Sequence, residues 1–279
     1  MDLNTIETVL RPRSRGDLPM WQAGDACLAG GTWLFSELQP ETRRLVDLAS
    51  LDWPPYAIDA DGLTLAATCT FAQLDRLDLP AAWIAAPLVG QCCRALLGSF
   101  KIWTFATVGG NLCLALPAGP MIALAAALEA TCTIWSPGGG ARSVAAWDFV
   151  LGPQRTVLEP GEILREIRIP AHALMVRTAF RRVSLTPNGR SGALLIGTCT
   201  ADGAFALTVT AAVRRPVRLA FPRLPDTMDL AHAIEDAIPE TLYHDDVHGR
   251  PDWRRHMTRY LAEEIRCALG DGVLEGAGR

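Results

Sequence analysis

The sequence contains no C-x-x-C pair, although eight of its 279 residues are cysteine. The only adjacent cysteines, Cys92 and Cys93, are poorly placed to share a metal ion. No spacing typical of iron–sulfur ligands occurs, which argues against a cluster held by this chain. We expect most of the cysteines to be small buried apolar residues that stay reduced.

An excess of positive charge is also absent. The chain has 26 Lys and Arg against 30 Asp and Glu, so its formal net charge of −4 gives no bulk electrostatic support for binding nucleic acid. The first residues lack the apolar core of a secretory signal. The longest apolar region, residues 112–128, is interrupted by Pro117 and Pro120 and is too short and kinked to span a bilayer. We therefore expect a cytoplasmic protein without a membrane span.

Three common site motifs are missing. The Rossmann fingerprint G-x-G-x-x-G and the P-loop G-x-x-x-x-G-K-[ST] do not occur, and neither does the zinc motif H-E-x-x-H. The histidines of residues 244–248, with His256 nearby, are better explained by a solvated polar loop than by a metal site. A bound dinucleotide would therefore have to be held by a different fold.

What the sequence does contain is two Gly-Gly turns of the kind that bind phosphate. The first, A-G-G-T, occupies residues 29–32, and the second, T-V-G-G-N, occupies residues 107–111. Paired glycines permit backbone angles that other residues avoid, so neighbouring amides can form a concave nest for an anion. Two such nests can hold the two halves of a pyrophosphate, which makes a dinucleotide the leading ligand.

The pattern around the first turn predicts a strand, the turn and then a helix. Short apolar runs at residues 27–29 and 45–48 favour strands, and residues 33–38 favour a helix. This order would place the first Gly-Gly pair at a helix N-terminus, where amides lack partners. Further strands are predicted at residues 62–67, 131–135 and 162–169, and further helices from residue 71 (capped by Thr70) and at residues 87–97, 121–130 and 145–149.

A boundary is expected at residues 170–172, after which the pattern changes. Three strands are predicted at residues 177–184, 193–199 and 204–210, separated by turns that contain Pro, Asn, Asp and Gly. A fourth apolar run, residues 217–221, is a further candidate for the same sheet. Helices are predicted at residues 227–238 and 251–269.

Short motifs follow one another through nearly the whole chain. They are A-G-G-T-W-L at 29–34, V-D-L at 46–48, T-V-G-G-N-L at 107–112, P-A-G at 117–119, F-V-L-G-P at 149–153, L-E-P-G-E-I-L at 158–164, F-R-R-V-S at 180–184 and W-R-R-H at 253–256. In this order they resemble the FAD-binding (medium) subunit of the molybdenum hydroxylase family, the xanthine dehydrogenase and carbon monoxide dehydrogenase type. One Gly-Gly pair is weak evidence, but the ordered set is specific.

The resemblance implies an α+β fold in two domains. Residues 1–170 would form the two-piece FAD-binding domain of the vanillyl alcohol oxidase or PCMH type, with subdomains of about 1–52 and 53–170. Residues 171–279 would form a small C-terminal α+β domain of the CO dehydrogenase flavoprotein type, with a three-stranded antiparallel sheet and helices.

The resemblance also implies the site. The backbone of residues 29–34 and 109–111 would hold the pyrophosphate of FAD, and Thr107 and Asn111 would add side-chain hydrogen bonds. Leu158 would lie against the flavin ring or the adenine region. Arg181 would lie near the flavin, where it could stabilise the reduced ring, although a strand-surface arginine is the alternative. Trp33 would either stack on the flavin or fill the core. The complete set of expected cofactor residues is Ala29, Gly30, Gly31, Thr32, Trp33, Leu34, Thr107, Gly109, Gly110, Asn111, Leu158 and Arg181.

Two segments depart from the family pattern. Pro120 stands where the family often has an aspartate that can reach a ribose, so a ribose contact of FAD is altered. Residues 101–105 read K-I-W-T-F where the family often has Q-I-R-N-R, so an edge of the cofactor or a partner surface differs. Neither departure affects the glycines, and the expected cofactor stays FAD.

The resemblance implies an electron-transfer subunit. A partner with two [2Fe–2S] clusters would deliver electrons from a molybdopterin subunit to FAD, which would pass them to NAD⁺, oxygen, a quinone or another acceptor. Whether such heterotrimers pair into a dimer is left open, as are the substrate and the acceptor. The alternatives are a self-contained FAD oxidase or dehydrogenase, which would need a base near the flavin, and a scaffold subunit that has lost FAD.

Overall fold

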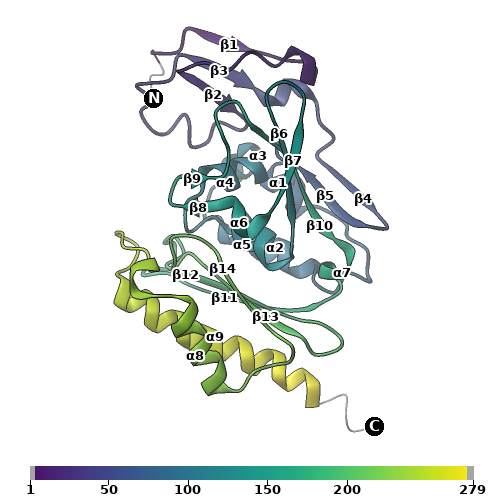
Figure 1. Ribbon diagram of the computed structural model, residues 1–279, viewed down its shortest axis with the longest axis vertical. Coiled ribbons are helices and arrows are strands. Elements are labelled where there is room, and N and C mark those ends of the chain that lie inside the picture. The colour runs from purple at the N-terminus through teal and green to yellow at the C-terminus, as the bar shows by residue number, and fades with distance from the viewer. Residues whose placement is uncertain (1–3, 275–279) are drawn as a thin grey trace.

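Four β-sheets organise the residues that the computed structural model describes, which are residues 4–274. A three-stranded sheet comes first, followed by a five-stranded sheet, a small two-stranded sheet and a four-stranded sheet. Figure 1 shows the chain running from the purple N-terminal sheet at the top, through the teal central part, to yellow helices at the bottom. The fold is mixed α/β.

The N-terminal sheet is parallel and has its third strand in the middle, with the order β1-β3-β2. Leu45 and Val46 of the central strand are buried, as expected for a strand with neighbours on both sides. The second strand ends directly before the first Gly-Gly pair, so the sheet fixes where that turn begins. The strands are β1 (Thr8–Leu10), β2 (Asp25–Leu28) and β3 (Arg44–Asp47).

The helix predicted at residues 33–38 is wrong, because this segment forms consecutive turns. The Phe35 amide donates to the Gly31 carbonyl at 2.8 Å and the Ser36 amide donates to the Trp33 carbonyl at 2.9 Å, but no helix follows. Gly31 has a left-handed φ of +69°, and the Ser36 hydroxyl bonds back to carbonyls of the same turn. A left-handed residue and a side chain that competes for main-chain carbonyls both oppose a helix.

The central sheet is antiparallel and has the order β4-β5-β10-β6-β7. Its strands are β4 (Tyr56–Asp59), β5 (Gly62–Ala66), β6 (Thr131–Trp135), β7 (Ala141–Ala145) and β10 (Ile163–Pro170). The two-stranded sheet consists of β8 (Val150–Gly152) and β9 (Arg155–Thr156). Most helices of this part lie in the long connection between β5 and β6, which also carries the second Gly-Gly pair.

The helices of this part differ in how deeply they are buried. They are α1 (Phe71–Asp75), α2 (Ala86–Ala95), α3 (Phe100–Phe105), α4 (Val108–Leu114), α5 (Pro120–Ala127) and α6 (Ala146–Phe149). Every residue of α5 is buried, which matches its apolar sequence. Helix α3 has no buried residue. Thr70 caps α1 as predicted, since its side chain accepts from the Gln73 amide.

The C-terminal sheet has four strands, not the three that were expected. Its strands β11 (Arg177–Val183), β12 (Ala193–Cys199), β13 (Phe205–Thr210) and β14 (Val217–Phe221) are antiparallel neighbours in chain order. The apolar run at residues 217–221 joins this sheet as the neighbour of β13. Without it, the buried strand β13 would have a row of backbone groups without hydrogen-bond partners. The short helix α7 (Ala171–Leu174) precedes this sheet.

Both faces of the C-terminal sheet are covered. Helices α8 (Thr227–Ala237) and α9 (Pro251–Leu274) pack on one face, and α5 from the central part packs on the other (Figure 1). Every residue of β12 and β13 is therefore buried. Alternate residues face opposite layers: Leu194 and Ile196 belong to the central core, while Leu195 belongs to the core under α9. None of the described helices carries an apolar stretch long enough to cross a membrane.

Candidate functional site

A cavity of about 560 Å³ opens where the N-terminal turn, α4 and the loop before β12 meet. Segments far apart in the sequence form its wall, including residues 29–34, residues 106–120, residues 158–164 and Arg190 with Ser191. All of the cofactor residues expected from the sequence line this cavity, except Arg181. The tertiary structure therefore brings the two Gly-Gly segments to one site.

The first Gly-Gly segment touches the second part of the site through its backbone. A Cβ atom added at Gly30 would lie 1.6 Å from the carbonyl oxygen of Phe105. Only glycine allows this approach. Gly31 next to it has the left-handed φ of +69°, which turns the chain across the cavity. Gly30 thus allows a close contact with the Phe105 carbonyl, and Gly31 allows the turn.

The amides of residues 30–34 are available to a ligand. Within the described part of the chain, none of them donates a hydrogen bond to a protein group, whereas the next amide, of Phe35, donates to Gly31. Residues 30–34 are only partly buried, so amides without a protein partner can bond there to water or to a ligand. Such a run in a turn that lines a cavity is a set of donors for an anion.

The second Gly-Gly segment is a helix start whose amides already have partners. Thr107 is the N-cap of α4, and its Oγ1 accepts from the Gly110 amide at 3.0 Å. The amides of Val108 and Gly109 donate to carbonyls of the loop after β5 at 2.8 and 2.9 Å, and the Asn111 amide donates to Thr107 at 3.0 Å. Neither glycine has a positive φ. This segment lines the cavity as expected, but its amides are engaged within the protein and do not form a run of open donors.

Close packing explains the first glycine of this second pair. A Cβ atom at Gly109 would lie 2.4 Å from the Cβ of Ala67 and 2.7 Å from its carbonyl oxygen. At Gly110 the only atom nearby is the flexible Thr107 hydroxyl, at 2.8 Å. Asn111 ties α4 to α5, because its Oδ1 accepts from the Met121 amide at 3.0 Å. The sequence motif thus fixes the helix against β5 and α5.

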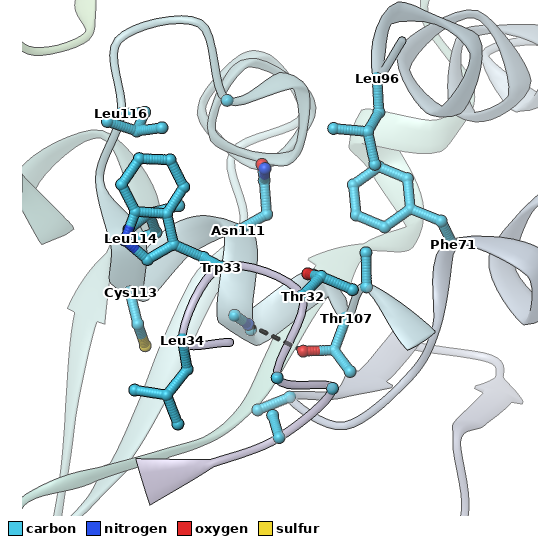
Figure 2. Close-up of a pocket in the computed structure, with 18 of the residues that line it drawn as sticks. Thr32, Trp33, Leu34, Phe71, Leu96, Thr107, Asn111, Cys113, Leu114 and Leu116 are labelled. Atoms are coloured by element: carbon cyan, nitrogen blue, oxygen red, sulfur yellow. Dashed lines mark hydrogen bonds between the residues drawn. The ribbon is translucent and has the colours of Figure 1, made fainter. Parts of the chain in front are cut away.

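Apolar side chains lie on both sides of the amide turn (Figure 2). Trp33, Leu114 and Leu116 lie on one side, which we call the Trp33 side, and Phe71 and Leu96 lie on the other, which we call the Phe71 side. The turn that carries Thr32, Trp33 and Leu34 passes between them in this view. The cavity therefore has a polar centre between two apolar regions.

The expected position of Arg181 beside a flavin is not what the geometry provides. Its guanidinium pairs with Glu264 of α9 at 3.1 Å and donates to the Phe180 carbonyl at 3.0 Å, and it does not line the cavity. The basic residue that does line the cavity is Arg190, whose guanidinium carbon lies 5.8 Å from the centre of the Trp33 ring. Sequence reasoning missed Arg190 and Ser191 because they belong to a loop without a recognisable motif.

Glu162 fixes the wall that carries Leu158. Its carboxylate forms a bidentate pair with Arg142 at 2.8 and 2.6 Å and accepts from the Glu159 amide at 3.0 Å. The Arg142 guanidinium, aided by these hydrogen bonds, lowers the pKa of Glu162 to about 2. The carboxylate is therefore ionised and engaged at neutral pH, which leaves it unsuited to act as a base.

The cavity holds neither a reactive thiol nor a metal site. Burial raises the pKa of Cys27 to about 12 and raises the pKa of Cys113 still further, so both thiols stay protonated. Among residues 4–274, no group of His, Cys, Asp and Glu is arranged to hold a metal ion. The loop at residues 244–248 is exposed at residues 245–247, as expected for a solvated loop, while His244 is largely buried and Asp246 pairs with Arg254 of α9.

The comparison with protein families agrees with this site. Residues 14–172, more than half of the chain, match the family described as FAD binding domain in molybdopterin dehydrogenase. The chain belongs to this family. The matched region contains both Gly-Gly segments and the Leu158 wall, and it ends just after β10.

Relatives within the family are subunits of dehydrogenases. The carbon monoxide dehydrogenase medium chain of Hydrogenophaga pseudoflava is 29% identical over 161 residues, which cover 56% of this chain and 54% of that one. Caffeine dehydrogenase subunit beta of Pseudomonas sp. (strain CBB1) is 36% identical over 98 residues, which cover 35% and 33%. The matched segments thus span about half of these relatives' length or less.

Solved structures extend the likeness of fold over nearly the whole chain. Reconstituted CO dehydrogenase from Oligotropha carboxidovorans aligns with a TM-score of 0.77 and 25% identity, covering 94% of this chain and 98% of the other. Quinoline 2-oxidoreductase from Pseudomonas putida 86 aligns with a TM-score of 0.76 and 24% identity, covering 96% and 97%. The FAD-binding family predicted from the sequence is confirmed, and the α+β expectation is confirmed only as far as a mixed α/β fold with an FAD-binding domain.

Proposed function

We propose that the cavity binds FAD with its diphosphate at the open amides of residues 30–34. These unpaired amides are the single observation that carries the proposal. Each hydrogen bond from an amide to a charged oxygen contributes about 1.5–3 kcal/mol, so several together supply most of what an anchored diphosphate needs. The first turn binds the diphosphate with little help from cations, since Arg190 is the only basic residue of the described chain that lines the cavity.

The residues present fit a dinucleotide in shape as well as in charge. FAD has two ring systems joined through a diphosphate, and the cavity has two apolar sides joined by a turn of open amides. Thr107 and Asn111 stand beside the turn, although the hydroxyl of Thr107 and the amide oxygen of Asn111 also serve α4 and α5. Leu158 adds apolar surface. Pro120 lies at the first turn of α5 and offers no acceptor to a ribose.

Bound FAD would accept electrons and pass them on, and the protein's part is to bind, orient and shield it. Residues 30–34 hold the diphosphate, and the apolar walls exclude water from the rings. No His or Tyr of the described chain lines the cavity, and of its two glutamates Glu162 is engaged with Arg142 while Glu37 is exposed. The site therefore offers no buried base for oxidising a substrate on its own, which supports electron transfer over a self-contained oxidase.

We propose that the chain works in a complex. A small subunit with [2Fe–2S] clusters would deliver electrons from a molybdopterin-binding large subunit, and NAD⁺, oxygen, a quinone or another acceptor would receive them. Support comes from the CO dehydrogenase relative, which is named a medium chain, and from the lack of a metal-binding cluster among residues 4–274. We also propose a two-piece FAD-binding domain to residue 170, with pieces of about 1–52 and 53–170, and a C-terminal domain from residue 171.

Ligand binding to the purified chain tests the FAD site directly. We expect FAD to bind and ADP to compete with it, whereas FMN, which has no diphosphate bridge, binds at least about tenfold more weakly, a difference of roughly 1.4 kcal/mol. Flavin fluorescence and calorimetry measure all three. Failure of FAD to bind, or equal binding of FMN and FAD, would overturn the proposal. Co-purification with the two partner chains tests the complex separately.

A further inference from the structure

Ser191 carries a hydroxyl that the protein leaves without a partner. The residue is 3% exposed, and its Oγ is buried and makes no hydrogen bond within the described chain. Buried polar groups almost always have a partner, and an orphan one is destabilising, so it requires an explanation. Ser191 lines the cavity, so a bound ligand is a candidate for the missing partner.

The backbone on either side of this hydroxyl is firmly held. The Gly192 amide donates to the Val183 carbonyl at 2.8 Å, and the Gly192 carbonyl accepts from Nη1 of Arg254 at 2.6 Å. Arg254 is 1% exposed and also donates to the carbonyls of Ala211 and Gly249. A loose loop therefore does not explain the orphan hydroxyl, because β12 begins at a fixed place.

The same contacts place Ser191 on the Trp33 side of the cavity. Arg254 binds the carbonyls of Gly192 and Ala211 together, and the Ala211 amide donates to the Pro117 carbonyl at 2.8 Å. Pro117 follows Leu116, which lies with Trp33 and Leu114 in Figure 2. The loop between β11 and β12 thus contributes to this side, whereas the Phe71 side is lined by residues of the central part.

Arg190 adds a positive charge at the same place. Its guanidinium carbon lies 5.8 Å from the Trp33 ring centre, and no described carboxylate lies within ion-pair distance of it. Flavin and adenine differ in what they require here. The flavin ring gains negative charge along its N1–C2 carbonyl edge on reduction, whereas adenine stays neutral, so a cation beside the ring favours the reduced state.

We propose that Ser191 is a positioning residue for the flavin ring, that its hydroxyl hydrogen-bonds to the ring's polar edge, and that Arg190 beside it favours reduction. The isoalloxazine ring therefore occupies the Trp33 side and the adenine the Phe71 side. This inference rests on the proposed FAD site.

The Ser191→Ala variant separates this role from a structural one. Without ligand the variant is as stable as the wild type or more stable, because it loses an unpaired hydroxyl. With FAD its affinity falls about three- to tenfold, the range of one hydrogen bond, and the visible flavin bands shift, while ADP affinity is unchanged. The matched control is Thr210→Val in the same sheet, whose Oγ1 donates to the Leu194 carbonyl at 3.1 Å. This control loses stability with and without FAD and keeps its FAD affinity.

Several outcomes would overturn the inference and leave the FAD site intact. The Ser191→Ala variant could bind FAD as tightly as the wild type, or lose affinity for FAD and ADP together. It could also be less stable than the wild type without ligand. If the wild-type chain itself does not bind FAD, the proposed function fails instead, so the two failures are distinct.

The Arg190→Gln variant tests the charge. We expect its flavin midpoint potential to become more negative by about 30 mV, which corresponds to a tenfold weaker preference for the reduced state in a two-electron couple. We expect a smaller effect on the affinity of the protein for oxidised FAD, which flavin fluorescence measures. An unchanged potential, measured against reference dyes, would contradict the placement of Arg190 beside the ring.

Discussion

The two Gly-Gly segments are alike in sequence and different in structure. Residues 30–34 present a run of amides without protein partners, while the amides at the start of α4 are all taken up by Thr107 and by carbonyls after β5. In the first segment Gly31 has a left-handed φ, and in the second neither glycine has one. The first is an open donor set, and the second is a packed helix start.

This difference teaches that a glycine pair beside a polar residue does not by itself make an anion site. The first pair lies at the end of β2, where the chain crosses the cavity in turns and leaves its donors open. The second pair lets α4 pack against Ala67. In that position the amides at the start of α4 donate to other groups of the protein. We expect the first segment to govern FAD affinity and the second to govern stability.

The largest effect should follow from Gly30→Ala. Its Cβ would lie 1.6 Å from the Phe105 carbonyl oxygen, so the turn must move away from residues 105–107 and the donors lose their alignment. We expect FAD affinity to fall at least about a hundredfold, roughly 3 kcal/mol, in flavin fluorescence titrations. Gly152→Ala is the control, since no atom lies within 4 Å of an added Cβ there. Near-normal affinity in the Gly30 variant would remove the first segment from the diphosphate site.

The neighbouring glycines of the second pair should respond very differently from each other. Gly109→Ala places a methyl group against the backbone of Ala67 and should lower the free energy of unfolding by about 2 kcal/mol. Gly110→Ala meets only the Thr107 hydroxyl, and the better helix propensity of alanine offsets the disturbed cap, so the change should stay within about 0.5 kcal/mol. Urea unfolding without FAD measures both. Equal effects would refute the packing explanation for this motif.

A smaller effect than that of Gly109→Ala is expected for the cap of α4. Thr107→Ala removes the acceptor of the Gly110 amide and should cost about 1 kcal/mol of stability, whereas Thr107→Ser should retain it. FAD affinity should fall far less than in the Gly30 variant, because the amides of α4 keep their other partners. If Thr107→Ala instead abolished FAD binding at unchanged stability, the two segments would be equivalent after all.

Much of the fold could be predicted from hydrophobic patterns. The strands at residues 62–66, 131–135 and 193–199 and the buried helix at residues 120–127 lie close to their expected places, because buried strands and apolar helices leave clear periodicity. The helix expected at residues 33–38 failed because a left-handed glycine and a serine side chain outweighed its helix-like pattern. The fourth C-terminal strand was only a candidate, because a short apolar run does not show from its own sequence which strand it pairs with.

The sequence alone determined the family. Its motifs mark turns and close contacts of the backbone, and their order through nearly the whole chain is specific to one fold. It also singled out both Gly-Gly segments, which line one cavity. Only the tertiary structure decided which segment has open donors, because a hydrogen-bond partner such as Ala67 comes from a distant part of the chain. It likewise turned Arg181 toward Glu264 and brought Arg190 and Ser191 to the cavity, since side chains meet through packing and not through proximity in sequence.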